Sequence, residues 1–197
     1  MSRYVLQTAI SALLISSTVE AQDLTYTLYG TPGLIEMPTA QSAPDAQITA
    51  NVSLFKQQQR ASFSFQLTPR FSGTFRYTGI PENNGVGTDG TFDRSFDLRY
   101  RFLDQGQWGA WTPAVAIGLQ DFLGTGKLSG EYLVASKSFG DTVVGTVGLG
   151  WGRLGSNNGF TNPLGFIDSS LETRPRNDFA DGGKISTSQF FRGDAAL

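Results

Sequence analysis

The sequence predicts an all-β protein, built as an antiparallel transmembrane β-barrel that follows an N-terminal signal peptide. Apolar and polar residues alternate with a period of two through successive segments, as they do on a strand with one apolar and one polar face. Most of these segments are about ten residues long, which is the length that a tilted strand needs to cross a bilayer. The chain is also rich in glycine (24) and phenylalanine (15), a composition that favours strands over helical bundles.

The N-terminus has the features of an export signal. Arg3 precedes the mostly apolar stretch "YVLQTAISALLISSTVEA", which closes with the small residues Val19 and Ala21. This arrangement predicts a signal peptide, residues 1–21, that is cut after Ala21. A single membrane anchor helix is the alternative, but the stretch is short for a span. We expect residues 22–45 to form an extended segment before the first long strand.

Seven segments predict strands, and together they make a partial barrel of about seven or eight strands. The first four alternate clearly, as in "FDRSFDLRYRFLD", where Phe92, Phe96 and Leu98 are separated by polar residues. The last three keep the length with a weaker contrast, and the facing of 130–139 is ambiguous. The predicted strands are 46–55, 61–69, 71–79, 92–103, 111–120, 130–139 and 142–153.

The connections between these strands differ in length. "TPRFSG", "DQGQWGAW" and "FGD" are compact, whereas residues 81–91 and 154–184 are long and rich in Gly, Asn and Pro. In outer-membrane barrels the short turns face the periplasm and the long loops face outside. We expect a helical turn or two in "PLGFIDSSLET", and a loop 154–184 that folds over or into the lumen.

The alternation assigns the apolar face to lipid and the polar face to a wet interior. Asp93 and Asp97 share the polar face of their strand with Arg99 and Arg101, so we expect ion pairs there rather than catalytic carboxylates. A soluble β-sandwich also alternates, but long strands with aromatic residues near both ends favour the barrel. The predicted lumen-lining residues are Arg76, Asp93, Asp97, Arg99, Arg101 and Glu131.

Composition excludes several kinds of chemistry. The chain has no His and no Cys, so the usual zinc ligands, the usual hydrolase base and a lipid-modified cysteine are all missing. The net charge is −2 with no basic cluster, which argues against a nucleic-acid partner. Gly150, Gly152 and Gly155 match a dinucleotide-binding pattern without the helix that it requires. We therefore expect no enzyme activity, no catalytic residues, no cofactor and no metal.

Several long motifs resemble one family. "YGTPGLIEMPTAQSAPDAQI", "FQLTPRFSGTFRYTGI", "FDRSFDLRYRFLDQGQW" and "PAVAIGLQDFLGTGKLSGEYLVASKSFG" are similar to the N-terminal part of the YjbH family, outer-membrane proteins of exopolysaccharide and capsule operons. The resemblance runs from about Tyr29 to Arg192. Family members are considerably longer, and "FFRGDAAL" reads like the approach to another strand, so we expect the chain to be a truncated piece.

The resemblance implies a function in the Gram-negative outer membrane. Such a protein would help exopolysaccharide or capsule polymer across that membrane, with membrane lipid, the polymer and other proteins of the export operon as partners. Two alternatives stay open: an outer-membrane barrel enzyme, and a structural barrel that anchors a periplasmic partner.

Overall fold

The structure, a computed structural model, describes residues 24–55, 57–81, 91–140, 142–175 and 188–197. The predicted signal peptide lies outside these residues, as does most of the predicted loop 81–91. One large sheet of eight antiparallel strands dominates the fold, and no α-helix is present in the described part, so the all-β, antiparallel prediction is confirmed.

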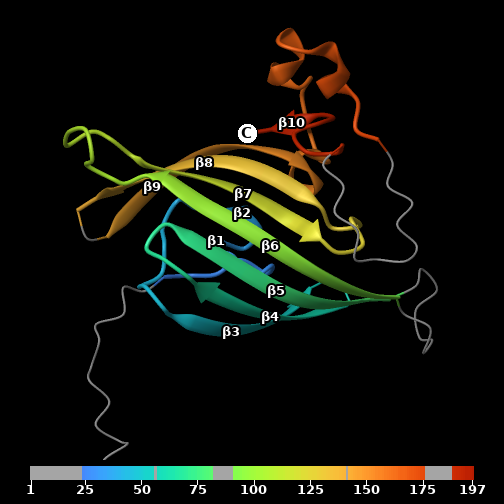
Figure 1. Ribbon diagram of the computed structural model, residues 1–197, viewed down its shortest axis with the longest axis horizontal. Coiled ribbons are helices and arrows are strands. Elements are labelled where there is room, and N and C mark those ends of the chain that lie inside the picture. Colours follow the sequence, from blue (N-terminus) through green and yellow to red (C-terminus); the bar gives the residue numbers. More distant parts are fainter. Residues whose placement is uncertain (1–23, 56, 82–90, 141, 176–187) are drawn as a thin grey trace, which may run out of the picture.

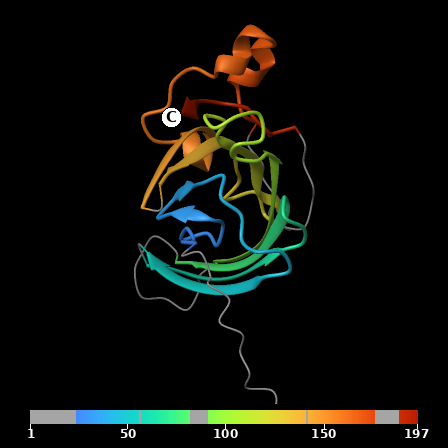
Figure 2. The same cartoon turned by 90° about the vertical axis from the view of Figure 1, so that its left-hand side faces the viewer.

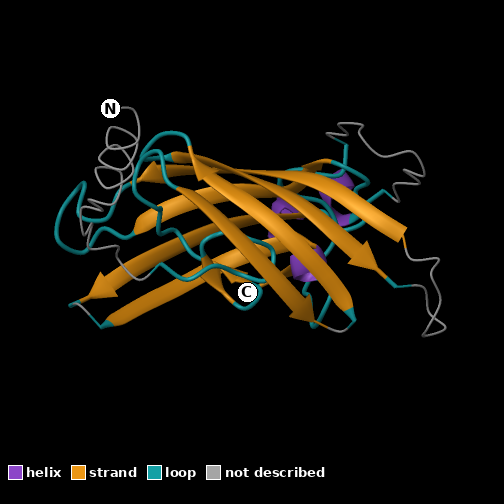
Figure 3. Ribbon diagram, turned by 90° about the horizontal axis from the view of Figure 1, so that it is seen from below, coloured by secondary structure: helices purple, strands orange, loops and turns teal. Residues whose placement is uncertain are grey.

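The strands of the large sheet follow one another in sequence order (Figure 1). Each pairs with the next in the chain, so the sheet is an antiparallel meander whose strands run side by side and obliquely across it (Figure 3). Its strands are β3 (Ile48–Phe55), β4 (Gln58–Gln66), β5 (Phe71–Ile80), β6 (Thr91–Leu103), β7 (Ala114–Leu123), β8 (Gly130–Phe139), β9 (Val143–Gly152) and β10 (Ala195–Ala196).

Each predicted strand overlaps one observed strand, and the ends differ for local reasons. The first begins at Ile48 because the preceding Ala46 has a left-handed backbone, with φ 60°. β7 begins at Ala114, after Pro113, which has no backbone N–H to donate to a neighbouring strand.

The sheet curves without closing. Seen end-on, it wraps around the N-terminal segment, which we define as residues 24–45 (Figure 2). The strand order runs from β10 to β3 with no pairing between these two, so the sheet is not closed into a barrel in the described part. β10 pairs with only Trp151 and Gly150 of β9.

The N-terminal segment lies within the curve and carries a small hairpin, β1 (Gly33–Leu34) with β2 (Met37–Pro38). Strands from the large sheet hold it by hydrogen bonds to its backbone. Ser53 Oγ donates to the carbonyl of Leu28 at 2.7 Å, and the N–H of Ala40 donates to Ser136 Oγ at 2.8 Å. The expectation of an extended segment here did not foresee this packing.

The segment after β9 contains three short 3₁₀ helices: η1 (Arg153–Gly155), η2 (Pro163–Phe166) and η3 (Ser169–Glu172). The last two coincide with the helical turns expected in "PLGFIDSSLET". In Figures 1 and 2, η2 and η3 lie beyond β8 and β10, outside the curve of the sheet. η2 and η3 therefore stay outside the interior, whereas Leu154 at the start of this loop packs against the buried cluster that contains Ala40 and Tyr132.

Candidate functional site

The two faces of the sheet have the reverse of the usual burial. Apolar side chains on the outer face are exposed: Val52 is 75% exposed and Phe63 is 51% exposed. Charged side chains on the inner face are buried: Arg76 is 0% exposed and Asp97 is 2% exposed. In soluble proteins Arg and Asp are almost never fully buried unless they are paired. We therefore expect the buried charges of the inner face to have partners.

Arg76 and Asp97 form a buried ion pair across β5 and β6. Arg76 Nη1 lies 2.7 Å from Asp97 Oδ2. The other carboxylate oxygen of Asp97 accepts a hydrogen bond of 2.8 Å from the N–H of Asp121, where β7 bulges opposite β6 and Asp121 has φ 53°. The bulge turns a backbone donor inward, so both oxygens of the buried carboxylate are satisfied.

Three arginines surround Tyr29 of the N-terminal segment. The guanidinium carbons of Arg153, Arg60 and Arg76 lie 3.6, 4.4 and 5.1 Å from the centroid of the Tyr29 ring. Arg60 also donates to the Tyr29 hydroxyl at 3.2 Å, and Arg76 donates to its carbonyl at 3.3 Å. Burial lowers the pKa of Arg153 below its ordinary value. Cation–π contacts and hydrogen bonds from these arginines thus hold Tyr29 on the inner face.

Arg99 also binds the N-terminal segment. Its guanidinium donates to the carbonyl of Thr39 at 3.2 Å, to Ser42 Oγ at 3.1 Å and to the carbonyl of Gln41. These bonds place Arg99 against the chain's own backbone, where it stabilises the packing of the segment.

The expected pairing of Asp93 and Asp97 with Arg99 and Arg101 is wrong. Asp97 pairs with Arg76, and Asp93 accepts a hydrogen bond from Thr125 Oγ1. Neighbours on one face of a strand stand roughly 7 Å apart, so a short Asp side chain meets groups on adjacent elements more readily. Distance along the strand, rather than charge, therefore decides these partners.

Arg101 is the last charged residue on the inner face of β6, and it is only partly buried. Its Nε lies 2.9 Å from Asp104 Oδ1, and its Nη2 donates to the carbonyl of Pro69 at 3.1 Å. It lines a polar cleft of about 310 Å³ at the end of the sheet that carries the 67–70 and 104–113 turns. The cleft residues are Gln41, Ser42, Arg101, Asp104, Gln105, Ala114, Ser136 and Ser138.

Glu131 is not an inner-face residue, and its assignment to the lumen is wrong. It pairs in register with Leu119 and Trp151, on the same face as the exposed Leu133. Arg174 clamps it with bonds of 2.7 and 2.9 Å, and the N–H of Phe191 donates to it at 3.0 Å. The segments after β9 therefore cover this part of the outer face, which explains why a carboxylate is buried there.

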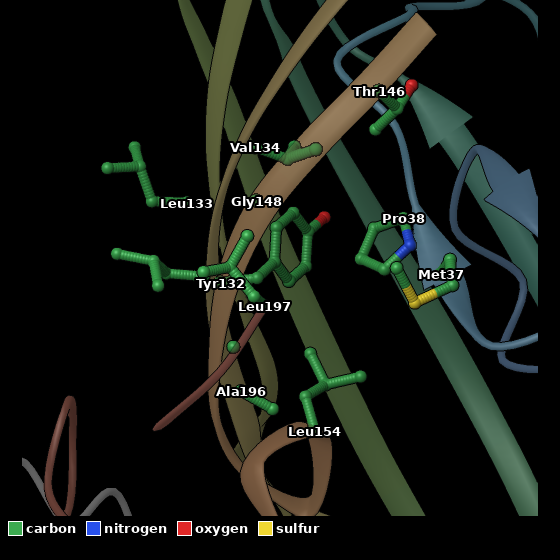
Figure 4. Close-up of a pocket in the computed structure, with 12 residues that line it drawn as sticks. Met37, Pro38, Tyr132, Leu133, Val134, Thr146, Gly148, Leu154, Ala196 and Leu197 are labelled. Carbon is green, nitrogen blue, oxygen red and sulfur yellow. The ribbon is translucent and has the colours of Figure 1, made fainter. Parts of the chain in front are cut away.

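A second, apolar cavity of about 60 Å³ lies beside β9. In Figure 4, Met37 and Pro38 lie across it from the ring of Tyr132, with Leu154 below. Ligand sites usually measure about 300–1,000 Å³, so this cavity is a packing gap rather than a binding site.

Sequence reasoning missed Tyr29, Arg60, Asp121 and Arg153 as parts of the inner network. Arg60 lies just before the predicted strand 61–69, and Arg153 lies at the very end of 142–153, so neither stood inside a clear alternation. Within the described residues, no three His, Cys, Asp or Glu side chains are grouped to hold a metal ion. No helix in that part is long and apolar enough to cross a membrane.

Comparison with known proteins agrees with the resemblance read from the motifs. The family model "Exopolysaccharide biosynthesis protein YbjH" matches residues 25–197. The "Uncharacterized lipoprotein YjbH" of Escherichia coli (strain K12) is 36% identical over 175 residues, which cover 86% of this chain and 24% of that protein. The chain thus spans about a quarter of the length of this relative. No solved structure matches. The predicted membership is confirmed: the chain belongs to the YjbH family of exopolysaccharide biosynthesis proteins.

Proposed function

We propose that this chain is a non-catalytic wall component of the outer membrane that assists the export or assembly of exopolysaccharide or capsule. The observation that carries the proposal is the reversed burial of the sheet. Its outer face exposes Ile48, Val52, Leu54, Phe63, Phe96 and Val147, while its inner face buries arginine and aspartate. An apolar face of this extent is suited to lipid, and a polar inner face is typical of outer-membrane barrels.

Aromatic side chains near both ends of the strands support a membrane position. At the end with the short turns, Trp108 and Trp111 are 78% and 82% exposed, and the ammonium of Lys137 lies 5.6 Å from the centroid of the Trp111 ring. At the other end, the rings of Tyr77 and Phe92 stack with centroids 5.3 Å apart. Trp, Tyr and Lys favour the two interfaces of a bilayer, which lie at these two levels.

The residues packed on the inner face favour a structural role for this sheet, as part of a barrel wall, over an open passage for polymer inside its curve. The N-terminal segment fills the curve of the sheet, and Arg60, Arg76 and Arg99 donate hydrogen bonds to it. Polymer would then meet the protein at the ends of the sheet. The lack of His and Cys supports a role without catalysis. The partners we propose are outer-membrane lipid, the polysaccharide and other proteins of the export operon.

The test combines localisation with a polymer assay. We expect the protein expressed from its own gene to sediment with outer membranes and to resist extraction by high salt, because hydrophobic contact with lipid is insensitive to ionic strength. Deletion of the gene should lower the polysaccharide at the cell surface, and a plasmid copy should restore it. Recovery of the protein as a soluble periplasmic species, or unchanged surface polymer in the deletion strain, would refute the proposal.

A further inference from the structure

The polar cleft at the short-turn end of the sheet has the size and lining of a ligand site. Its volume of about 310 Å³ reaches the range usual for small-molecule sites. Three separate parts of the chain line it: the N-terminal segment, the end of β6 with its turn, and the inner face of β7 and β8. A ligand in the cleft would therefore contact groups that the fold has already brought together.

Several polar groups in the cleft are unused. The side-chain amide of Gln41, the Nε2 of Gln105 and the hydroxyl of Ser138 make no hydrogen bond within the described residues. Gln105 Oε1 accepts from the N–H of Ser138 at 2.7 Å, and this bond fixes the Gln105 amide in position. Amides and hydroxyls both donate and accept, as vicinal sugar hydroxyls require.

Arg101 and Asp104 are the charged residues that line the cleft, and Arg70 bonds Asp104 without lining it. Asp104 is shared by two arginines: Arg101 Nε lies 2.9 Å from its Oδ1, and Arg70 Nε donates to its Oδ2 at 3.1 Å. Arg101 is fixed by this pair and by its bond from Nη2 to the carbonyl of Pro69. Its Nη1 makes no hydrogen bond in the described part of the chain. A guanidinium that is held in place with one edge free is well suited to bind a carboxylate.

We propose that this cleft binds a uronic-acid unit of a polysaccharide, with Arg101 Nη1 donating to the sugar carboxylate and Gln41, Gln105 and Ser138 bonding its hydroxyls. The inference rests on the proposed function, which supplies the polymer, and adds where the polymer is held and which sugar class is preferred. The site lies at the end of the sheet that we place on the periplasmic side, where an exported chain first meets the protein.

Titration calorimetry on the purified full-length protein in detergent tests the site. The probes are a hexasaccharide of β-1,4-linked glucuronic acid and a glucose hexasaccharide with the same linkage. We expect the uronate probe to bind more tightly than the glucose probe. Arg101→Gln should weaken the uronate probe about tenfold and leave the glucose probe nearly unchanged, because it removes a charge-assisted bond. Gln105→Ala, on an exposed turn, should weaken both probes.

The matched control is Arg94→Gln, which removes the same charge from an exposed side chain near the opposite end of β6. It should bind both probes as the parent does. Absence of binding by either probe, or equal loss in Arg101→Gln and Arg94→Gln, would overturn the inference. Because Gln105→Ala removes no ion pair, it tests the site even if Arg101→Gln folds poorly. If the protein sediments with outer membranes and supports surface polymer while no probe binds, the inference fails and the proposed function stands.

Discussion

At the scale of single residues, the molecule depends on buried charges that are paired by neighbours far away in the sequence. Arg76 and Asp97 meet across two strands, and Arg99 reaches residues 39–42 of the N-terminal segment. The alternation identified Arg76, Asp93, Asp97 and Arg99 as inner-face residues, because facing is a local property of a strand. It could not identify their partners, which the register and the path of the segment decide.

The ion pair of Arg76 predicts a large effect of a small change. Asp97→Asn keeps the shape of the side chain but leaves a fully buried guanidinium without its counter-charge, which typically costs about 3–5 kcal/mol. We expect the free energy of unfolding in detergent, measured by urea titration, to fall by that amount. Asp45→Asn, which removes an exposed carboxylate, should change it by less than about 0.5 kcal/mol. Similar losses in the two variants would argue against a buried pair.

At the scale of elements, the strands could be predicted from the sequence, but the bulge in β7 and the packing of the N-terminal segment against the sheet could not. The clear alternation in 46–55, 61–69, 71–79 and 92–103 predicted both strand and facing. In 130–139 the two faces have similar polarity, so the facing of Glu131 could not be read and was assigned wrongly. The bulge at Asp121 and the packing of the N-terminal segment leave no periodic signal in the sequence, because both depend on contacts with distant strands.

The N-terminal segment provides a prediction of its own at Gly30. Its φ is 82°, and an added Cβ would lie 2.3 Å from Ser62 Oγ on the inner face of β4. Gly30→Ala should therefore lift the segment, which limited proteolysis would detect as faster cleavage within residues 24–45. Gly106→Ala has a similar φ of 79° but no atom within 4 Å, so it isolates the backbone strain. We expect Gly106→Ala to leave the protection of residues 24–45 from proteolysis unchanged. Equal cleavage in both variants would show that the close packing at Gly30 does not determine this protection.

β4 offers a test, within one strand, of the proposal that the outer face meets lipid. Phe63→Arg near the middle of the strand should cost roughly 2–4 kcal/mol in a bilayer, whereas Gln59→Arg near its end should cost at most about 1 kcal/mol. Both side chains lie on the outer face and are exposed. Unfolding titrations in lipid vesicles measure the two costs. Equal values would mean that depth in a membrane does not matter, as expected for a sheet in water.

At the scale of the whole molecule, the sheet has its apolar surface outside and little apolar core. The largest cluster of buried apolar residues is Ala40, Ala114, Ala116, Tyr132 and Val134 in the described part. Removal of the outer face from water would contribute about 25 cal/mol per Å² of apolar area. Most of the hydrophobic stabilisation is thus available only when something covers that face.

Stability should therefore depend on the amphiphile around the protein. We expect the midpoint of thermal unfolding, followed by circular dichroism, to rise when detergent exceeds its critical micelle concentration and to fall again on dilution below it. A soluble sandwich carries its core inside and would show no such rise. A midpoint that is the same above and below that concentration, with a monomer in water alone, would contradict the membrane proposal.

The borders of the sheet at β3 and β9 have a consequence for the order in which such a protein matures. No further strand of the sheet lies beyond β3 in the described part, and β9 shares only two residue pairs with β10. Water can satisfy the free N–H and C=O groups along these sides, but hydrocarbon cannot, and each unsatisfied group there costs several kcal/mol. A sheet of this kind cannot enter lipid one strand at a time. Under the proposed outer-membrane role, completion of its borders and entry into the bilayer are therefore expected to occur as a single cooperative event.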